Sequence, residues 1–210
     1  MSADLAELAE RLSIERLLQD WGLWRDTGRW DRLRATYAPG ATMKTTWFSG
    51  AAGEFVDASM RAAARPAVVL HVMGPSHVEI QRDRALAETR VTLLVRDLLD
   101  GTSVDVTCHG RFIDRLIKLG DRWAILSREP IYEKDFIMPT RAGTPIHFDE
   151  AVLQALPAGY RHLAYLQSRG GARIQLDIPA HNSPEQERLY QQGQAWLEGA
   201  VVQPSREEKS

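Results

Sequence analysis

The residues with the clearest potential for chemistry are a histidine inside an apolar run and an aspartate at the end of a helical segment. His71 lies within residues 68–74, whose other side chains are aliphatic or methionine up to the final glycine. A short apolar run that ends in Gly74-Pro75 is typical of a buried strand, and a buried imidazole needs a hydrogen-bond partner. We interpret Asp26 as that partner. The two would form a general acid/base dyad at the bottom of a closed pocket.

Asp26 follows residues 5–24, in which apolar side chains recur every three or four positions as in a helix. Gly28 suits the left-handed conformation that often follows a helix end. A carboxylate is unfavourable there, because the C-terminal end of a helix carries partial negative charge. Two explanations stay open: Arg25 and Arg29 neutralise Asp26 at the surface, or Asp26 points inward to a histidine.

The composition argues against several classes of partner and cofactor. A net charge of -2, from 26 basic and 28 acidic side chains, provides no electrostatic footprint for nucleic acid or an anionic membrane. No phosphate-binding loop, dinucleotide motif or nucleophile elbow is present, so a nucleotide cofactor is not expected. The six histidines lack the HExxH pattern and any other metal-ligand spacing. We therefore expect neither a metal nor a cofactor.

The single cysteine and the hydropathy pattern bear on the compartment. Cys108 alone cannot form an intrachain disulfide. No basic segment followed by an apolar core begins the sequence, and no apolar run approaches the roughly 18 residues of a membrane span. We expect a cytoplasmic protein.

The segments that must position these residues follow an α+β pattern. Helical periodicity predicts helices at residues 5–24, 30–37 and 54–65, with a strand at 41–47. Alternation predicts a strand that breaks at Gly74-Pro75 and resumes at 77–80, followed by long strands at 87–96, 104–112 and 123–127. Asp100-Gly101 and residues 119–121 are hairpin turns. The expected fold is three helices packed on one face of a curved antiparallel sheet.

Residues 140–202 differ in character from the preceding segment. Helices are predicted at 149–156, 158–168 and 183–197, and a short strand at 174–179. Because ~60 residues with two or three short helices form only a marginal core, we expect an extension wrapped on a domain of residues 1–139. The polar residues 203–210 are expected to be disordered.

Four short motifs carry a resemblance to a known family: WGLWRD ending at Asp26, the helix starting WDRL at Trp30, the Leu70-His71 strand and the hairpin GDRWAI from Gly120. Over roughly residues 5–138 the chain resembles the SnoaL-like branch of the nuclear transport factor 2 (NTF2-like) superfamily. The resemblance implies an NTF2-like cone, in which helices cover a curved sheet and enclose a pocket.

Within that branch the chain is similar to scytalone dehydratase, bile acid dehydratase and hexachlorocyclohexane dehydrochlorinase, which are cofactor-free lyases. The resemblance implies that Asp26 orients His71 as the base. It also places Arg128 on the last strand, where it would stabilise developing negative charge. An ion pair of Arg128 with Glu129 or Asp114 is the alternative.

Two positions depart from those enzymes. Trp21 stands where they carry a lysine or tyrosine five residues before the aspartate. His109 falls near the second active-site histidine of scytalone dehydratase, but strict alternation places it on the face of Asp105 and Arg111. Only a bulge, for which Gly110 is a candidate, would turn His109 inward.

Aromatic side chains near the expected pocket suggest a flat hydrophobic substrate, aromatic or polycyclic, although the same residues could be core. These are Trp21, Trp24, Trp47, Phe48 and Tyr37. Tyr37 and Tyr132 are further candidates for a catalytic hydroxyl, and Tyr132 could act as a phenol donor.

A histidine–aspartate dyad without an activated serine or cysteine favours elimination or isomerisation over acyl transfer. The leading hypothesis is a cofactor-independent lyase that expels water, halide or a small carbonyl fragment such as formaldehyde. A ring or double-bond isomerase using the same base is the close alternative. A non-catalytic ligand-binding protein, or one resembling the small subunits of ring-hydroxylating dioxygenases, is the alternative from another class. We expect a homodimer or higher homo-oligomer.

Overall fold

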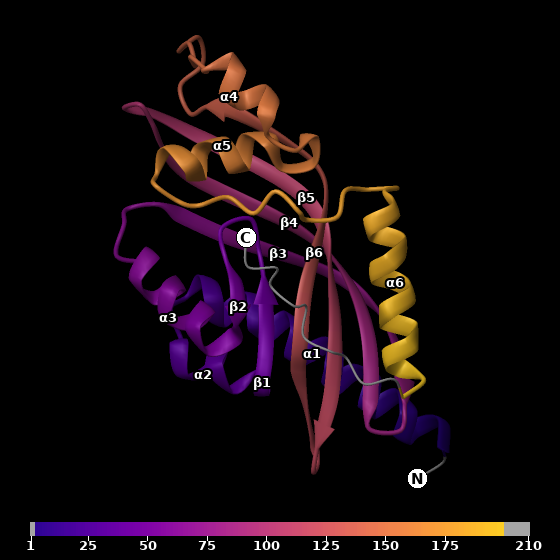
Figure 1. Ribbon diagram of the computed structural model, residues 1–210. Helices are drawn as coiled ribbons and strands as arrows, with labels where there is room; N and C mark the ends of the chain where they lie inside the picture. Colours follow the sequence, from indigo (N-terminus) through magenta and orange to yellow (C-terminus); the bar gives the residue numbers. More distant parts are fainter. Residues whose placement is uncertain (1–2, 200–210) are drawn as a thin grey trace.

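The computed structural model describes residues 3–199 (Figure 1). Its N-terminal part contains helices α1 (Ala3–Asp26), α2 (Trp30–Ala35) and α3 (Ala52–Ala62), and short strands β1 (Tyr37–Lys44) and β2 (Ser49–Ala51). Four long strands follow: β3 (Val68–Gln81), β4 (Arg84–Leu99), β5 (Thr102–Leu119) and β6 (Arg122–Pro139). The C-terminal part contains α4 (Glu150–Ala155), the 3-10 turn η1 (Ala158–Tyr160), α5 (Arg161–Arg169) and α6 (Pro184–Leu197). The predicted α+β class is confirmed.

The six strands form one sheet in the order β2-β1-β6-β5-β4-β3. β3 to β6 make an antiparallel meander with three turns, two of which fall at the predicted hairpins, whereas the turn between β3 and β4 at residues 82–83 was not predicted. β1, however, pairs with β6 in parallel. The sheet is therefore mixed and not purely antiparallel. Parallel pairing needs a long crossover, and the segment from α3 through β5 supplies one between β1 and β6.

The predicted break at Gly74-Pro75 is wrong. β3 runs through both residues, and its register against β4 shifts between Met73 and Ser76. A bulge of this kind tolerates a proline without ending the strand. Gly74 also fits closely, since a Cβ there would lie 3.2 Å from Cβ of Arg90.

Two other predicted segments differ from the structure. Helix α2 ends at Ala35, and β1 starts at Tyr37, where the sequence predicts that the helix continues. Residues 174–179 form no strand. The neighbouring contact is an isolated bridge between Tyr132 and Ala180.

Helix α1 carries apolar residues on two faces. Ile14, Leu18 and Trp21 are buried against the sheet, whereas Leu5, Leu8 and Leu12 are about half exposed. The earlier leucines lie on the far side of the helix from Ile14, at 100° of rotation per residue. The apolar repeat thus predicts the helix correctly, but it does not show which stripe is buried.

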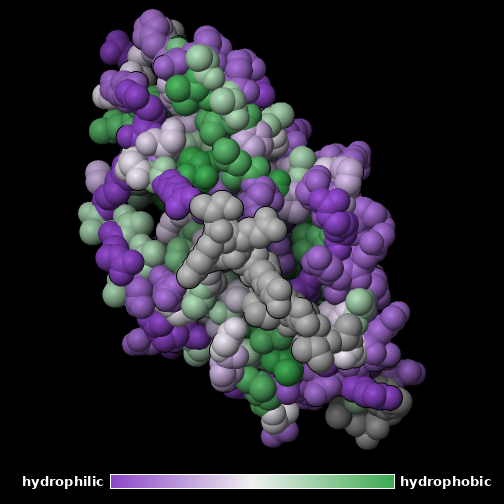
Figure 2. Space-filling model, viewed as in Figure 1, coloured by the Kyte–Doolittle hydropathy of each residue, from purple (hydrophilic) through white to green (hydrophobic). Residues whose placement is uncertain are grey.

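The two faces of the sheet are covered differently. On the pocket face, defined by Val91, Leu93, Val95 and Phe112, helices α1 to α3 cover one end of the long strands, and α4 and α5 cover the other (Figure 1). On the opposite face, called here the outer face, α6 packs Leu189 and Leu197 against Leu86, Ile113 and Ile131. Figure 2 shows apolar residues gathered over the region of α4 and α5.

Residues 140–199 thus contact both faces of the sheet. The extension also binds the loop between β1 and β2: the Thr46 hydroxyl lies 2.6 Å from Oε1 of Gln167, and the Gln175 amide donates to the Thr46 carbonyl at 2.8 Å. The prediction of disorder for residues 203–210 lies outside the described residues. Within residues 3–199, no helix is both long and apolar enough to span a membrane.

Candidate active site

His71 and Asp26 lie in direct contact, although 45 residues separate them in sequence. Nδ1 of His71 is 2.6 Å from Oδ1 of Asp26, and the backbone N–H of His71 donates to Oδ2, also at 2.6 Å. Each side chain is only 11% exposed. Both carboxylate oxygens therefore bind one residue, which fixes the position of the imidazole.

The elements explain this contact. β3 is at the edge of the sheet, where backbone N–H groups lack a strand partner, and Asp26 accepts one of them. α1 approaches β3 closely at Gly22, where a Cβ would lie 2.8 Å from Cγ of Met73. The two donors of His71 also offset the unfavourable position of Asp26 at the helix end. Of the two explanations left open for Asp26, the structure has the one in which it points inward.

The ring of His71 is held in one orientation. With Nδ1 bonded to Asp26, Nε2 makes no hydrogen bond to any residue in the described part of the chain. Trp21 packs against the ring edge-on, with centroids 5.4 Å apart. Burial lowers the pKa of His71, and the bonds to Asp26 oppose that shift. The imidazole is therefore neutral at pH 7, with its Nε2 lone pair available.

A cavity of about 460 Å³ adjoins this pair. Its walls come from α1, β1, the long strands and the end of α5. The residues near the dyad are Trp21, Arg25, Asp26, Gly28, Trp30 and His71; the sheet contributes Met43, Val91, Leu93, Val95, Phe112 and Tyr132; the far end includes Arg65, Asp97, Leu166, Gln167 and Ala172. This volume suits a small ligand.

The predicted aromatic residues divide into two groups. Trp21 and Trp47 line the cavity, together with Trp30, Phe55 and Phe112, which the sequence analysis did not select. Phe48 packs behind this wall against Trp47 and Phe55 and does not line it. Trp24 lies outside as well, with the guanidinium groups of Arg29 and Arg32 4.8 and 4.9 Å from its ring centroid.

Tyr37 is buried and does not line the cavity. Its hydroxyl accepts a hydrogen bond of 2.7 Å from Nε1 of Trp21, and burial raises its pKa. The structure thus gives Tyr37 a supporting role for Trp21, not the catalytic position considered from the sequence.

Arg128 does not reach the cavity. It is fully buried and forms a two-bond ion pair with Asp114, with Nε to Oδ1 at 2.6 Å and Nη2 to Oδ2 at 2.9 Å. Its guanidinium stacks 4.1 Å from the ring centroid of Trp21 and 4.6 Å from that of Phe112. Direct strand pairing of Asp114 with Arg128 causes this arrangement. Of the two alternatives for Arg128, the structure has the ion pair.

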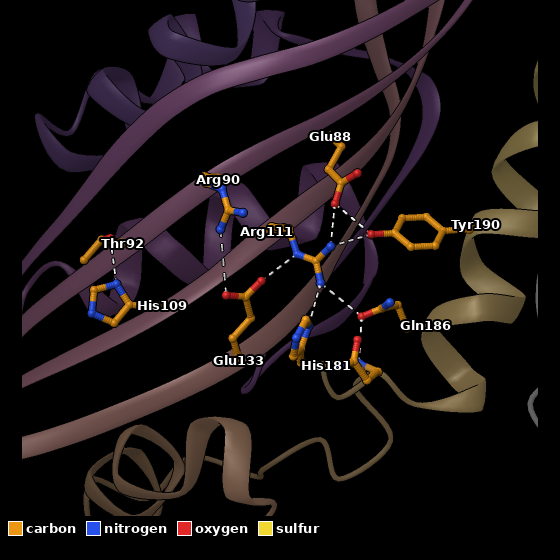
Figure 3. Close-up of polar contacts among 10 residues, drawn as sticks. Glu88, Arg90, Thr92, His109, Arg111, Glu133, His181, Gln186 and Tyr190 are labelled. Atoms are coloured by element: carbon orange, nitrogen blue, oxygen red, sulfur yellow. Dashed lines mark hydrogen bonds and ion pairs between the residues drawn. The ribbon is translucent and has the colours of Figure 1, made fainter.

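His109 lies on the outer face, beside Thr92 and on the same side of the sheet as Arg111 (Figure 3). Its Nδ1 is 3.0 Å from the Thr92 hydroxyl. A register shift does occur at Gly110, but the additional residue is on β6. β5 therefore keeps its alternation, and His109 does not turn toward the pocket.

Several of the other polar groups in Figure 3 attach α6 to the sheet. Arg111 is 2.7 Å from carboxylate oxygens of both Glu88 and Glu133, and it donates to Oε1 of Gln186 at 3.0 Å. Tyr190 of α6 donates to Glu88 at 2.7 Å. This network lies across the sheet from the cavity.

Tyr132 lines the cavity. It is 5% exposed, its ring packs against Tyr160, and burial raises its pKa well above the ordinary value. The phenol is therefore protonated at pH 7 and can donate a proton or a hydrogen bond.

Arg25 is a charged residue of the cavity wall that the sequence analysis considered only as a surface partner of Asp26, in one of the two explanations left open. It lines the wall next to Asp26, and burial lowers its pKa. The missed signal is its spacing, because Arg25 follows Trp21 by four residues and Leu18 by seven, on the face of α1 that contacts the sheet.

The donor set in the described part of the chain does not assemble a metal centre: no group of three or more histidine, cysteine or carboxylate side chains is placed to hold an ion. Cys108 is buried, and burial raises its pKa, so it is a poor nucleophile.

Helices enclosing a pocket over one face of a mixed sheet, with a histidine–aspartate pair inside, define an NTF2-like cone. Comparison with known proteins agrees. Residues 6–129 match the model of the SnoaL-like domain family, which is more than half of the chain. The chain belongs to this SnoaL-like family of the NTF2-like superfamily.

Two relatives are similar to this chain over most of its length. A PEP2-like protein from Fusarium vanettenii is 31% identical over 206 residues, covering 92% of this chain and 88% of that protein. Pea pathogenicity protein 2 of the same fungus is 30% identical over 205 residues, with the same coverage. Their names state no reaction.

Two solved structures share the fold. A putative scytalone dehydratase from Novosphingobium aromaticivorans has a TM-score of 0.55 at 17% identity, covering 68% of this chain and 96% of that one. A hexachlorocyclohexane dehydrochlorinase has a TM-score of 0.56 at 16% identity, covering 70% and 99%. At these identities the likeness concerns the fold alone.

Proposed function

We propose that this protein is a cofactor-independent lyase acting on a small, largely hydrophobic substrate. The observation that carries the proposal is a buried imidazole oriented by a carboxylate beside a cavity of about 460 Å³, with its second nitrogen bonded to none of the described residues. The names of the two solved structures, a dehydratase and a dehydrochlorinase, are consistent with elimination chemistry on this fold.

In the proposed reaction, Nε2 of His71 removes a proton from a carbon or hydroxyl of the substrate. The freed electron pair forms the new double bond and expels the leaving group with its own pair. Asp26 stabilises the imidazolium that results, as a carboxylate does in other histidine dyads. A leaving oxygen needs a proton, which the Tyr132 phenol or the imidazolium can donate, whereas a halide needs none.

Aromatic rings form much of the wall near the dyad, which supports an aromatic or alicyclic substrate. We would incubate the protein, without added cofactor, with hydroxylated aromatic dimers, hydroxysteroids and halogenated alicyclics. Ultraviolet absorbance reports new conjugation, and product mass separates elimination from isomerisation, in which the mass does not change.

The variants His71→Ala and Asp26→Asn test the dyad. We expect each to lose activity by a factor of roughly 100 or more, since general-base catalysis contributes about that much. His162→Ala is the matched control, because His162 forms another histidine–aspartate pair, with Asp135 at 2.9 Å, outside the cavity. Full activity in His71→Ala, or turnover of no substrate in the panel, would contradict the lyase proposal and favour a binding or assembly function.

A further inference from the structure

The cavity wall contains a positively charged side chain, Arg25, whose role the His71–Asp26 pair does not explain. Arg25 lines the wall next to the residue that orients His71, one helical turn beyond Trp21. Its guanidinium carbon lies 5.9 Å from the ring centroid of Trp30, and the charge of Asp26 also acts on it. Within residues 3–199, Arg25 makes no hydrogen bond and no ion pair.

The charge of Asp26 attracts Arg25, but no carboxylate in residues 3–199 hydrogen-bonds to it. Both oxygens of Asp26 bind His71. Asp97, at the far end of the cavity, lies 3.5 Å from Arg65, which also donates to the Gly170 carbonyl. Arg128 has its own partner in Asp114. Arg25 therefore differs from these two arginines, because no acceptor in residues 3–199 bonds to its donors.

A partly buried guanidinium that lacks an acceptor gains from an anionic ligand. Its planar set of N–H donors matches a carboxylate or another oxygen anion, and such charge-assisted hydrogen bonds are stronger than neutral ones. The neighbouring wall is aromatic, with Trp21 and Trp30 on either side of Arg25 in sequence.

We propose that Arg25 binds an acidic oxygen of the substrate, a carboxylate or an ionised phenol, while the hydrocarbon part fills the cavity beside His71. That the ligand is a substrate rests on the proposed function. It restricts that substrate to flat, largely apolar molecules that carry an oxygen anion. It also gives Arg25 the anion-stabilising role expected of Arg128.

Such binding would act on the base as well. The positive charge of Arg25 is among the groups that lower the pKa of His71. An anion bound to Arg25 offsets that charge, so the pKa of His71 rises when the ligand binds. Charge at the ligand oxygen would thus make the imidazole a stronger base in the complex than in the free protein.

The test compares two probes of nearly the same shape, naphthalene-2-carboxylate and naphthalene-2-carboxamide, by calorimetry. An ionised nitrophenol and its methyl ether form a second pair, which separates phenolates from carboxylates. We expect the wild type to prefer at least one anion by about tenfold or more, the factor that a charge-assisted hydrogen bond supplies. Arg25→Gln should remove that preference with little change in affinity for the neutral probe.

Two controls accompany this variant. Arg29→Gln removes a nearby exposed arginine that lies on Trp24, and Arg65→Gln removes the other arginine that lines the cavity. Both should keep the preference, and Arg25→Lys should keep part of it. NMR titration of His71 in the wild type should show its pKa rising with the anionic probe and not with the neutral one.

Equal affinity for charged and neutral probes in the wild type would overturn the proposal, as would a preference that survives in Arg25→Gln or disappears in Arg65→Gln. These outcomes do not depend on turnover. A preserved anion preference in a protein that converts no substrate would leave the binding role of Arg25 in place and reject the lyase. Turnover confined to neutral substrates would support the lyase and reject the binding role of Arg25.

Discussion

The basicity of His71 results from opposing interactions within a few ångströms. Burial is the largest influence and lowers its pKa, and the positive charges of Arg25 and Arg128 act in the same direction. The hydrogen bond and the negative charge of Asp26 raise it. The net shift is downward, so the imidazole is unprotonated over a wider pH range than a solvent-exposed histidine.

The pH dependence of activity should reflect this shift. We expect kcat/KM to stay level through pH 7 and to fall only below the ordinary histidine value of about 6.5. Arg25→Gln should move the midpoint of that fall to higher pH, since it removes a charge that disfavours the imidazolium. A midpoint above 6.5 in the wild type would show that Asp26 outweighs burial.

The lowered pKa of His71 also makes the free energy of unfolding depend on pH. The unfolded chain binds the proton more readily than the folded one, so His71 reduces stability as pH falls below about 6.5.

The buried pair of Arg128 and Asp114 supports the pocket from behind Trp21. Arg128→Met leaves a buried carboxylate without its partner, and we expect it to lower the free energy of unfolding by roughly 3–5 kcal/mol. The double variant Arg128→Met with Asp114→Leu should recover much of that loss, because neither charge remains. Urea unfolding measures both.

The matched control is Arg188→Met, which removes an exposed ion pair with Glu185 on α6. It should change stability by less than about 1 kcal/mol. Equal stabilities for Arg128→Met and this control would show that the buried pair contributes little.

At the scale of elements, the turn η1 determines how tightly the extension packs behind Tyr132. Gly159 is buried there, and a Cβ would lie 2.6 Å from the Tyr132 carbonyl oxygen and 3.1 Å from its carbon. Both atoms are backbone, which cannot move away as the end of a flexible side chain can. The glycine is therefore needed for the close approach of η1 to β6.

Gly159→Ala should destabilise the protein by about 1–3 kcal/mol, the usual cost of overpacking, and should displace Tyr132 from its place in the cavity wall. Gly53→Ala is the control, since a Cβ there meets only Nη1 of Arg34, at 3.3 Å. Thermal unfolding and tyrosine-sensitive near-ultraviolet circular dichroism provide the measurements. Unchanged stability in Gly159→Ala would mean that η1 can shift at little cost.

At the scale of the whole molecule, the outer face is covered by α6 over only part of its length. Beyond α6, a row of paired residues crosses four strands: Leu70, Leu94, Thr107 and Phe136. Leu70 and Phe136 are 46% and 45% exposed, and Val72 and Met138 in the adjacent rows are 54% exposed. Large exposed apolar patches of this kind mark interaction surfaces.

We predict that this patch joins two copies of the chain, in agreement with the homo-oligomer expected from the sequence. A two-fold contact uses the same patch on both copies, so a single charge introduces two repulsive groups. Phe136→Asp should convert the dimer to a monomer, and Leu176→Asp, at an exposed leucine of the extension, should not. Light scattering gives the mass, and a monomeric wild type would contradict the prediction.

The sequence predicts most of the elements because their signals are local. Period-two alternation indicates the long strands, helical periodicity indicates α1, and glycine-containing turns indicate the hairpins. Two errors have physical causes that local patterns do not reveal. The strand β3 continues through Pro75 because a bulge against β4 accommodates it, and β1 pairs in parallel because distant segments meet at β6.

The sequence by itself determined which residues could do chemistry. Its spacing left two explanations open for Asp26, and the resemblance to the SnoaL-like branch favoured the one in which Asp26 meets His71. Tertiary structure decided which groups surround each charged side chain. Whether Arg128 faces a ligand or Asp114, and whether Arg25 faces water or a cavity, depends on which groups the sheet and helices bring within hydrogen-bond distance. Such contacts join residues far apart in sequence, and their energies depend on burial, which no local spacing specifies.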